Sequence, residues 1–311
     1  MTTPTIPLII IQGPTATGKS DLALRLVEEL PLEIISADSR QVYRLLDIGT
    51  SKPSRSIRES IPHHLIDMVY PDQEYNAGDF CHDAASAIEQ VIKNGNIPLV
   101  VGGTGFYIRS LLEGLAWIPD IPAAIKEELR REINRLGSKG LYRKLRSVDP
   151  AAASRINQND LQKLSRALEV YLYTGKPISH FWEIQQYESK YRTFNIMITE
   201  NRDVLYKRIN SRILKMLQDG LLTEIDSLLA AGYKETDPGM ITVGYREFYP
   251  YFKQVKTLED CTAEAQKNTR NYAKRQFTWY KKIYFDLTLV ASGISFSHIK
   301  KKISAFMAPE Q

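Results

Sequence analysis

The sequence predicts an α/β protein in which helices flank a central parallel sheet and an all-helical insertion domain interrupts this core. Three observations predict it. Short β-branched runs alternate with helical patterns early in the 311 residues, residues 113–190 read as entirely helical, and a strand-like run follows them. The 43% hydrophobic content is enough for a full core, and the length suits two domains or one domain with an insertion.

The first part of the core is expected over residues 1–112, where four strands alternate with helices. The strands are "IPLIII", "LEIIS", "HLIDMV" and "IPLVV", and helices are expected over 19–30, over 78–93 and after "GGTG". Parallel strands need crossover connections, which helices usually supply. This alternation therefore favours a parallel sheet over an antiparallel one.

The helical insertion is expected over residues 113–190, and "AAIKEELRREINRL" and "DLQKLSRALEVYLYTG" are its clearest helices. The core then resumes at the strand "TFNIMIT" and continues through long helices over 191–290. Residues 291–311 are expected to form a C-terminal tail.

A phosphate-binding loop, "GPTATGKS", lies between the first strand and the first helix. The spacing G-x4-G-K-S in this strand–loop–helix context indicates a P-loop, whose amides and lysine bind a di- or triphosphate and whose serine hydroxyl binds Mg²⁺. The core is thus predicted to be a P-loop core. We assign phosphate binding to the whole loop: Gly13, Pro14, Thr15, Ala16, Thr17, Gly18, Lys19 and Ser20.

Asp38 follows the second strand, and ligands of open α/β sheets bind at the carboxyl ends of strands. A carboxylate there can accept a proton from a nucleophile, although an Asp-Ser pair can equally be a helix N-cap. Arg208 and Arg212 are four residues apart and share one face if their segment is helical. Spacing alone leaves phosphate binding and surface exposure open for both arginines.

Basic residues are concentrated in two stretches, although the whole chain has a formal net charge of only +5. Residues 261–282 hold six basic residues and one acid, and residues 126–146 hold eight and three. Such stretches suit a polyanionic partner or solvated helix faces. For Phe277 and Trp279, within the first stretch, we expect packing in the core.

Several classes of protein do not fit the sequence. Cys81 and Cys261 are far apart and form no metal-ligand spacing, and no run of apolar residues is long enough to cross a membrane. His63 and His64 have no other metal-spaced partner nearby and are expected in a loop or at a strand edge.

Seven segments together resemble the tRNA dimethylallyltransferase family, in the order in which that family has them, from about Ile9 to Tyr284. They are "GPTATGKS", "SADSRQVYRLLDIGTSKP", "PHHLIDMVYPDQEYNAGDF", "PLVVGGTGFYIRSLLEGL", "QKLSRALEVYLYTGK", "ITVGYREF" and "TRNYAKRQFTWYKK". The resemblance implies transfer of a dimethylallyl group from dimethylallyl diphosphate to the exocyclic amine of the adenosine 3′-adjacent to the anticodon, with Mg²⁺ and release of diphosphate.

The resemblance also implies roles for individual residues. Asp38 would be the proton acceptor, Thr15 would contact the substrates, and Arg212, with its neighbour Arg208, would bind the diphosphate. The target base would be flipped out of its stack. The residues implied in tRNA binding are Asp38, Ser39, Arg40, Gln41, Thr104, Lys126, Gln162, Lys163, Leu164, Ser165, Arg166, Gly244, Tyr245, Arg246, Lys274 and Arg275.

Other functions stay open on the sequence. An adenylate isopentenyltransferase, acting on free AMP or ATP, shares the loop and the base, and a P-loop kinase shares the loop. An RNA-binding protein with a vestigial loop is a third alternative, against which the intact Gly18, Lys19, Ser20 and Asp38 argue. Relatives in eukaryotes carry a C-terminal zinc finger that this sequence does not show, and no Arg-rich transit segment is present. We therefore expect a bacterial, cytoplasmic protein without membrane contact, and a monomer is the working expectation.

Overall fold

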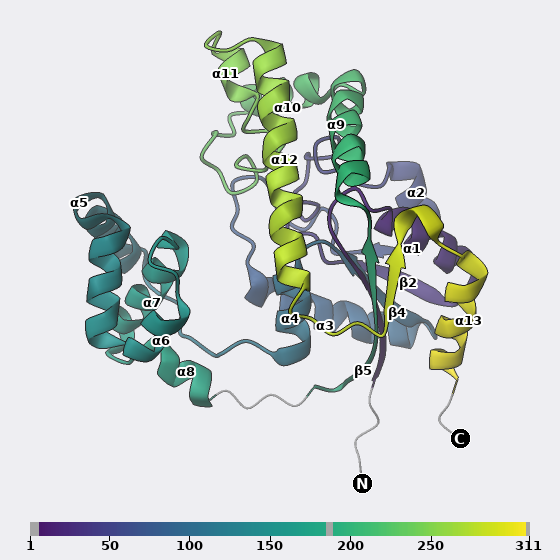
Figure 1. Ribbon diagram of the computed structural model, residues 1–311, viewed down its shortest axis with the longest axis horizontal. Coiled ribbons are helices and arrows are strands. Elements are labelled where there is room, and N and C mark those ends of the chain that lie inside the picture. Colours follow the sequence, from purple (N-terminus) through teal and green to yellow (C-terminus); the bar gives the residue numbers. More distant parts are fainter. Residues whose placement is uncertain (1–5, 185–188, 309–311) are drawn as a thin grey trace. The chain divides into compact units, whose positions relative to one another are not determined.

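One sheet of six parallel strands lies at the centre of the computed structural model, which describes residues 6–184 and 189–308 (Figure 1). The strand order is β3-β2-β4-β1-β5-β6, and Ile9 of β1 lies opposite Leu99 of β4 and Phe194 of β5. The predicted parallel α/β sheet is therefore confirmed. The strands are β1 (Ile6–Gln12), β2 (Leu32–Ser36), β3 (His63–His64), β4 (Ile97–Gly102), β5 (Tyr191–Thr199) and β6 (Leu287–Val290).

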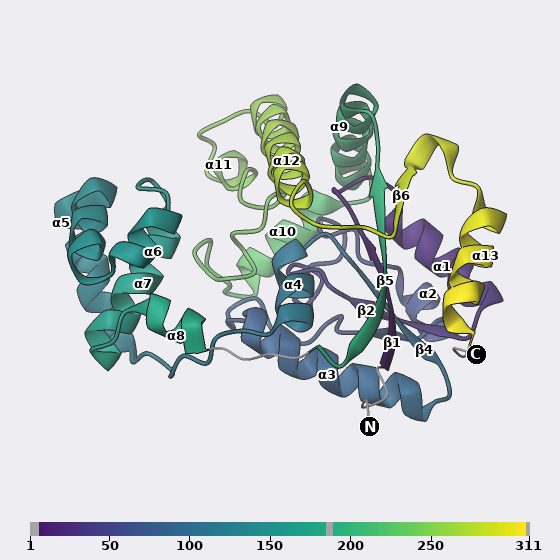
Figure 2. The same cartoon turned by 60° about the horizontal axis from the view of Figure 1, so that its bottom comes forward.

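Helices cover both faces of the sheet (Figure 2). Leu8 and Ile10 of β1 pack with α3 (Ala77–Lys93) and α4 (Gly105–Glu113). Ile9 and Ile11 point to the opposite face, where α1 (Lys19–Glu29) and α13 (Phe296–Met307) bury them. A central parallel strand buried on both faces needs a continuous apolar run, which explains "PLIII".

A third group of helices extends beyond the sheet and brings later segments of the chain to its carboxyl edge. These helices pack with residues 42–46 in one apolar cluster that includes the fully buried Tyr245 and Phe248. They are α9 (Arg202–Gln218), α10 (Leu221–Ala230), α11 (Tyr249–Phe252) and α12 (Leu258–Tyr280), and the short α2 (Arg55–Ser60) follows the 42–46 segment in the chain.

Residues 114–184 form a separate compact unit that is entirely helical, with its own core around Leu141, Leu145, Leu164 and Leu168. The insertion was expected over 113–190. Its helices are α5 (Ala123–Val148), which is broken at Gly137, α6 (Pro150–Arg155), α7 (Leu161–Thr174) and α8 (Ile178–Ile184). The other unit contains the described residues 6–113 and 189–308.

Two parts of the fold differ from the prediction. The expected tail, 291–311, instead begins with the turn η1 (Ala291–Gly293) and continues into α13, where Ile299 and Ile303 are fully buried against the sheet. The strand expected at "HLIDMV" is only two residues long. Leu65 and Asp67 have φ angles of +64° and +58°, and left-handed residues cannot continue a strand.

Candidate active site

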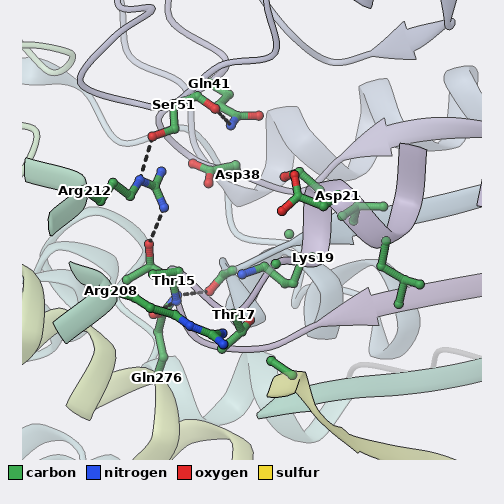
Figure 3. Close-up of a pocket in the computed structure, with 18 of the residues that line it drawn as sticks. Thr15, Thr17, Lys19, Asp21, Asp38, Gln41, Ser51, Arg208, Arg212 and Gln276 are labelled. Atoms are coloured by element: carbon green, nitrogen blue, oxygen red, sulfur yellow. Dashed lines mark hydrogen bonds between the residues drawn. The ribbon is translucent and has the colours of Figure 1, made fainter. Parts of the chain in front are cut away.

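The phosphate loop joins β1 to α1 and lines a pocket of about 780 Å³ (Figure 3). Gly13 has a φ of +155°, and a Cβ there would lie 2.1 Å from the Ile198 carbonyl oxygen, so only glycine fits against β5. Gly18 (φ +82°) is the N-cap of α1. The pocket therefore contains the amino end of a helix, where N–H groups and the helix dipole favour an anion.

Lys19 is folded back over the loop, and its Nζ donates to the Pro14 carbonyl at 2.7 Å. Thr17 Oγ1 donates to the same oxygen at 2.8 Å. Burial lowers the pKa of Lys19 from 10.5 to about 8, nearby Asp38 opposes this shift, and Arg212 adds to it. A bound anion would favour the charged form of Lys19, so phosphate binding would raise the pKa of this lysine.

Asp38 lies two residues beyond β2 and lines the same pocket as the phosphate loop. Its Oδ1 accepts the backbone N–H of Arg40 at 2.8 Å, and turns follow it in the chain. The alternative that Asp38 caps a helix is therefore wrong. The carboxylate also acts electrostatically on Lys19 and Arg212, which agrees with its predicted place across the crevice from the loop.

Arg208 and Arg212 both lie on α9, so the shared helical face that their spacing predicted is present, and both arginines line the pocket. Arg212 donates from Nε to Ser51 Oγ at 2.7 Å and from Nη1 to Thr15 Oγ1 at 3.2 Å. Arg208 instead pairs with the buried Glu200, with Nη2 3.2 Å from Oε2. Two arginines therefore line the same pocket as Lys19 of the phosphate loop.

The residues predicted to meet the flipped base form hydrogen bonds with one another and with neighbouring segments of the chain. Thr104 Oγ1 accepts the N–H of Ser39 at 3.0 Å, and Arg40 Nη1 donates to the Pro238 carbonyl at 3.0 Å. The Gln41 amide bonds Ser36 and the carbonyls of residues 50 and 51. An adenine edge would have to displace these partners of Gln41.

Of the residues of the α/β unit that were predicted to bind tRNA, some are exposed and others are buried. Lys274 and Arg275 on α12 and Arg246 are exposed. Gly244 and Tyr245 are buried, and the Tyr245 hydroxyl donates to Glu224 at 2.6 Å. The expected tRNA contact of the Tyr245 side chain is therefore corrected, because that ring fills the apolar cluster instead.

Phe277 and Trp279, which were expected to pack in the core, are both half-buried. Phe277 packs against the cluster of Leu205 and Ile209, and the Trp279 ring meets Phe106 edge-on at 6.3 Å. His63 and His64 form the edge strand β3, as expected, and His64 Nε2 lies 2.8 Å from Glu33.

In the helical unit, the predicted residues lie on two helices, Lys126 on α5 and "QKLSR" on α7. Lys126, Gln162, Lys163 and Arg166 are exposed, and Ser165 is half-buried. Leu164 is fully buried in the core of this unit, so its side chain does not reach RNA, contrary to the expectation. Its neighbours are the residues that this helix presents to solvent.

The oxygen ligands near Ser20 fit Mg²⁺. Ser20 and the carboxylates of Asp21 and Asp38 line the pocket, and the described residues contain no cluster of three or more His, Cys, Asp or Glu suited to a metal. Mg²⁺ usually keeps several waters and binds through one or two protein oxygens plus substrate phosphates. A diphosphate on the loop would complete such a set of ligands beside Ser20.

Sequence reasoning missed several residues of the pocket. Gln276 was included only in an RNA-facing block, yet its Oε1 accepts the Thr15 N–H at 2.9 Å. Ser51 was not singled out, and Ala291, Ser292 and Ile294 were assigned to the tail although they line the pocket. Spacing gave no signal for these residues, because long-range folding brings them to the site.

Comparisons with known proteins identify relatives of this chain. A family model described as IPP transferase matches residues 41–283. The chain is 41% identical to tRNA dimethylallyltransferase 1 of Syntrophotalea carbinolica over 97% of this chain and 96% of that protein. It is 44% identical to tRNA dimethylallyltransferase of Geobacter sulfurreducens, over 88% and 89% of the two chains.

Solved structures give the same result. A tRNA delta(2)-isopentenylpyrophosphate transferase from Staphylococcus epidermidis is similar with a TM-score of 0.69 at 36% identity, covering 97% of this chain and 99% of its own. A eukaryotic dimethylallyltransferase acting on tRNA is similar with a TM-score of 0.76 at 30% identity, covering 97% of this chain and 77% of its own.

Proposed function

The chain belongs to the IPP transferase family, and from this premise we propose that it prenylates tRNA. It transfers a dimethylallyl group from dimethylallyl diphosphate to the exocyclic amine of the adenosine 3′-adjacent to the anticodon. The observation that carries this proposal is one pocket that contains a phosphate loop, two arginines and a carboxylate, in a chain whose relatives are tRNA dimethylallyltransferases.

Asp38 is the proposed proton acceptor. In the reaction the allylic C–O bond breaks and diphosphate leaves with its electron pair, while the amine nitrogen forms the new C–N bond and loses a proton. Asp38 is the carboxylate at the strand end, and its bond from the Arg40 N–H fixes its orientation. A base so placed can take the proton as the amine reacts.

The diphosphate leaving group is proposed to bind the loop amides, Lys19, Arg212 and Arg208. Fixed positive charges in a half-enclosed pocket stabilise the charge that develops on the leaving oxygen. Mg²⁺, held beside Ser20, would neutralise part of the diphosphate charge when bound. The same loop shape would admit ATP, but the proposed reaction does not consume it.

The exposed basic residues are proposed to grip the tRNA. Their proposed phosphate contacts are Lys274 and Arg275 on α12, Arg246, and Lys126 and Arg166 of the helical unit, all of which are exposed. The target base would be flipped into the pocket, with the segment of Ser39 to Gln41 and Thr104 beside it. Single-stranded loops whose bases splay outward suit this kind of recognition.

We also propose that the protein works as a cytoplasmic monomer. None of the helices in the described part of the chain has the length and apolar character needed to span a bilayer.

The test is to incubate the protein with tRNA, Mg²⁺ and dimethylallyl diphosphate, without ATP, and to measure the masses of the digested nucleosides. Prenylated adenosine is the expected product. Replacing tRNA by AMP tests the adenylate isopentenyltransferase activity, and adding ATP with radiolabelled γ-phosphate tests a kinase. Modification of free AMP at the tRNA rate, or phosphate transfer without prenylation, would contradict the proposal.

A further inference from the structure

Four residues form a hydrogen-bonded chain along the pocket, and each comes from a different segment (Figure 3). Gln276 Oε1 accepts the N–H of Thr15 at 2.9 Å, and Thr15 Oγ1 accepts from Arg212 Nη1 at 3.2 Å. Arg212 Nε in turn donates to Ser51 Oγ at 2.7 Å. The two inner members, Thr15 and Arg212, are the proposed substrate contacts, and the two outer members hold them.

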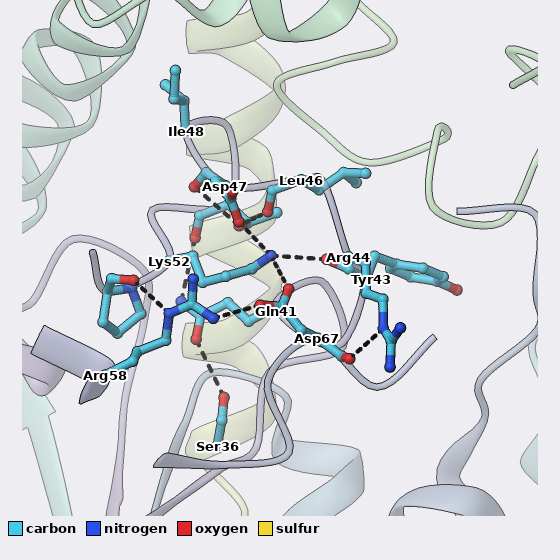
Figure 4. Close-up of polar contacts among 12 residues, drawn as sticks. Ser36, Gln41, Tyr43, Arg44, Leu46, Asp47, Ile48, Lys52, Arg58 and Asp67 are labelled. Carbon is cyan, nitrogen blue, oxygen red and sulfur yellow. Dashed lines mark hydrogen bonds and ion pairs between the residues drawn. The ribbon is translucent and has the colours of Figure 1, made fainter. Parts of the chain in front are cut away.

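Ser51 is held in an unfavourable conformation. Its φ of +50° lies in the left-handed region, which costs free energy for residues other than glycine and is typically found where the surroundings impose it. The next residue, Lys52, has a fully buried side chain whose Nζ bonds Asp47 and Asp67 at 2.6 Å each and the Tyr43 carbonyl at 2.9 Å (Figure 4). These contacts of the buried lysine fix the loop at Ser51.

Two further contacts hold the same loop. The Glu224 carboxylate accepts the backbone N–H groups of residues 47, 48 and 49 at 3.0, 2.8 and 3.3 Å. Gln41 Nε2 donates to the carbonyls of residues 50 and 51 at 3.4 and 3.3 Å. The segment that presents the Ser51 hydroxyl to Arg212 is therefore anchored on both sides.

Gln276 holds the other end of the chain. It lies on α12, is 6% exposed, and joins the phosphate loop to the turn after β4, because its Nε2 donates to the Gly103 carbonyl at 2.8 Å. Tyr280, one helical turn later, donates to the same carbonyl at 3.2 Å. The inner face of α12 thus fixes the phosphate loop at Thr15.

We propose that Ser51 and Gln276 are positioning residues for the donor diphosphate, a role that rests on the proposed function. Ser51 orients the Arg212 guanidinium through Nε, and Gln276 sets the backbone of Thr15. Arg212 Nη2, which bonds to no described residue, is then free to reach a diphosphate oxygen. A guanidinium fixed before the ligand arrives loses less rotamer entropy on binding than a mobile one.

The test uses the full-length chain and the variants Ser51→Gly, Ser51→Ala, Gln276→Met and the double variant Ser51→Gly with Gln276→Met. Each single variant should lower kcat/KM for dimethylallyl diphosphate about fivefold to tenfold, the usual effect of one lost hydrogen bond. The KM for tRNA should stay unchanged. The double variant should lose less than the product of the single effects, because both residues act on the Thr15–Arg212 pair.

Ser51→Gly separates positioning from stability. Glycine adopts a φ of +50° without strain, so this variant should melt at or above the wild-type temperature and still lose donor affinity. Ser60→Ala, an exposed hydroxyl on α2, and Gln266→Met on α12 are matched controls that should leave both KM values unchanged. Wild-type donor kinetics in Ser51→Gly and Gln276→Met, or an equal rise in the KM for tRNA, would overturn the proposal.

A second measurement makes failure of this inference distinguishable from failure of the proposed function. Calorimetry of inorganic diphosphate with Mg²⁺, in the absence of tRNA, should show Kd raised about fivefold to tenfold in each single variant. If the wild-type protein makes no prenylated adenosine, the proposed function fails, and this titration still tests the positioning. Unchanged diphosphate affinity in all three single variants would refute the positioning role.

Discussion

The pocket of the α/β unit and helix α7 of the helical unit hold their polar side chains in opposite ways. In the pocket, polar groups from distant segments meet in partly buried hydrogen bonds, as when the Thr15 N–H bonds the Gln276 side chain, 261 residues away. In the helical unit, polar side chains on α7 are exposed and pair with near neighbours, Lys163 with Asp160 at 3.0 Å and Arg166 with Glu169 at 3.7 Å. Chemistry needs fixed geometry in a shielded site, whereas attraction to RNA needs accessible charge.

The largest effect should come from Asp38→Asn. This change keeps the shape and the bond from the Arg40 N–H but removes the base, so single-turnover prenylation should fall about 100- to 10,000-fold, the usual contribution of a general base. The affinity for tRNA, measured by filter binding, should hold. A lower prenylation rate with unchanged tRNA affinity would show that the pocket carries out the chemistry without determining tRNA binding.

The control for this change is Asp226→Asn, an exposed carboxylate on α10, which should leave the rate intact. Retention of the full prenylation rate in Asp38→Asn would remove Asp38 as the base and would place the proton acceptor elsewhere in the pocket.

The sequence predicted those parts of the site that local structure determines. The phosphate loop is fixed by its glycines and by the strand and helix beside it, and Arg208 and Arg212 share a face because they are one helical turn apart. Ser51 and Gln276 could not be found in this way. Their partners lie 161 and 261 residues away, so only the folded chain gives these side chains a role.

The fold shows the same division. Alternating strands and helices predicted the parallel sheet, because each strand must bury both faces. The four-residue strand β6 was missed because "LTLV" is too short to give a clear pattern. The helix α13 was missed because its isoleucines are recognised as core residues only once they pack against the sheet. Left-handed Leu65 and Asp67, which end β3, have no sequence signal, since neither is glycine.

The second prediction is a pH dependence of donor binding. In the free enzyme burial lowers the pKa of Lys19 to about 8, so the lysine is charged below that pH and neutral above it. A diphosphate binds the charged form, and donor affinity should therefore fall as pH rises through 8, by up to about tenfold per pH unit. Titration of inorganic diphosphate with Mg²⁺ between pH 7 and about 9.5 measures this.

Lys19→Arg is the matched variant for this measurement, because a guanidinium stays charged across the range. Its diphosphate affinity should be nearly independent of pH. Equal slopes in the wild type and in Lys19→Arg would show that another group titrates. The exposed cations of the helical unit should give no such slope for tRNA, which is a direct contrast between the two units.

The smallest effect is expected from the exposed cations of the helical unit. Lys126→Ala and Arg166→Ala each remove one proposed phosphate contact, so tRNA affinity at moderate salt should fall only about twofold to fivefold, and the slope of log K against log[salt] should shrink by about 0.7 to 0.9 per residue. The prenylation rate at saturating tRNA should stay at the wild-type value.

Lys93→Ala on α3 is the control, and it should change neither the affinity for tRNA nor the salt slope. Unchanged slopes in both variants would remove these residues from the tRNA interface, and a fall in the saturated rate would mean that the helical unit contributes to the chemistry as well as to binding.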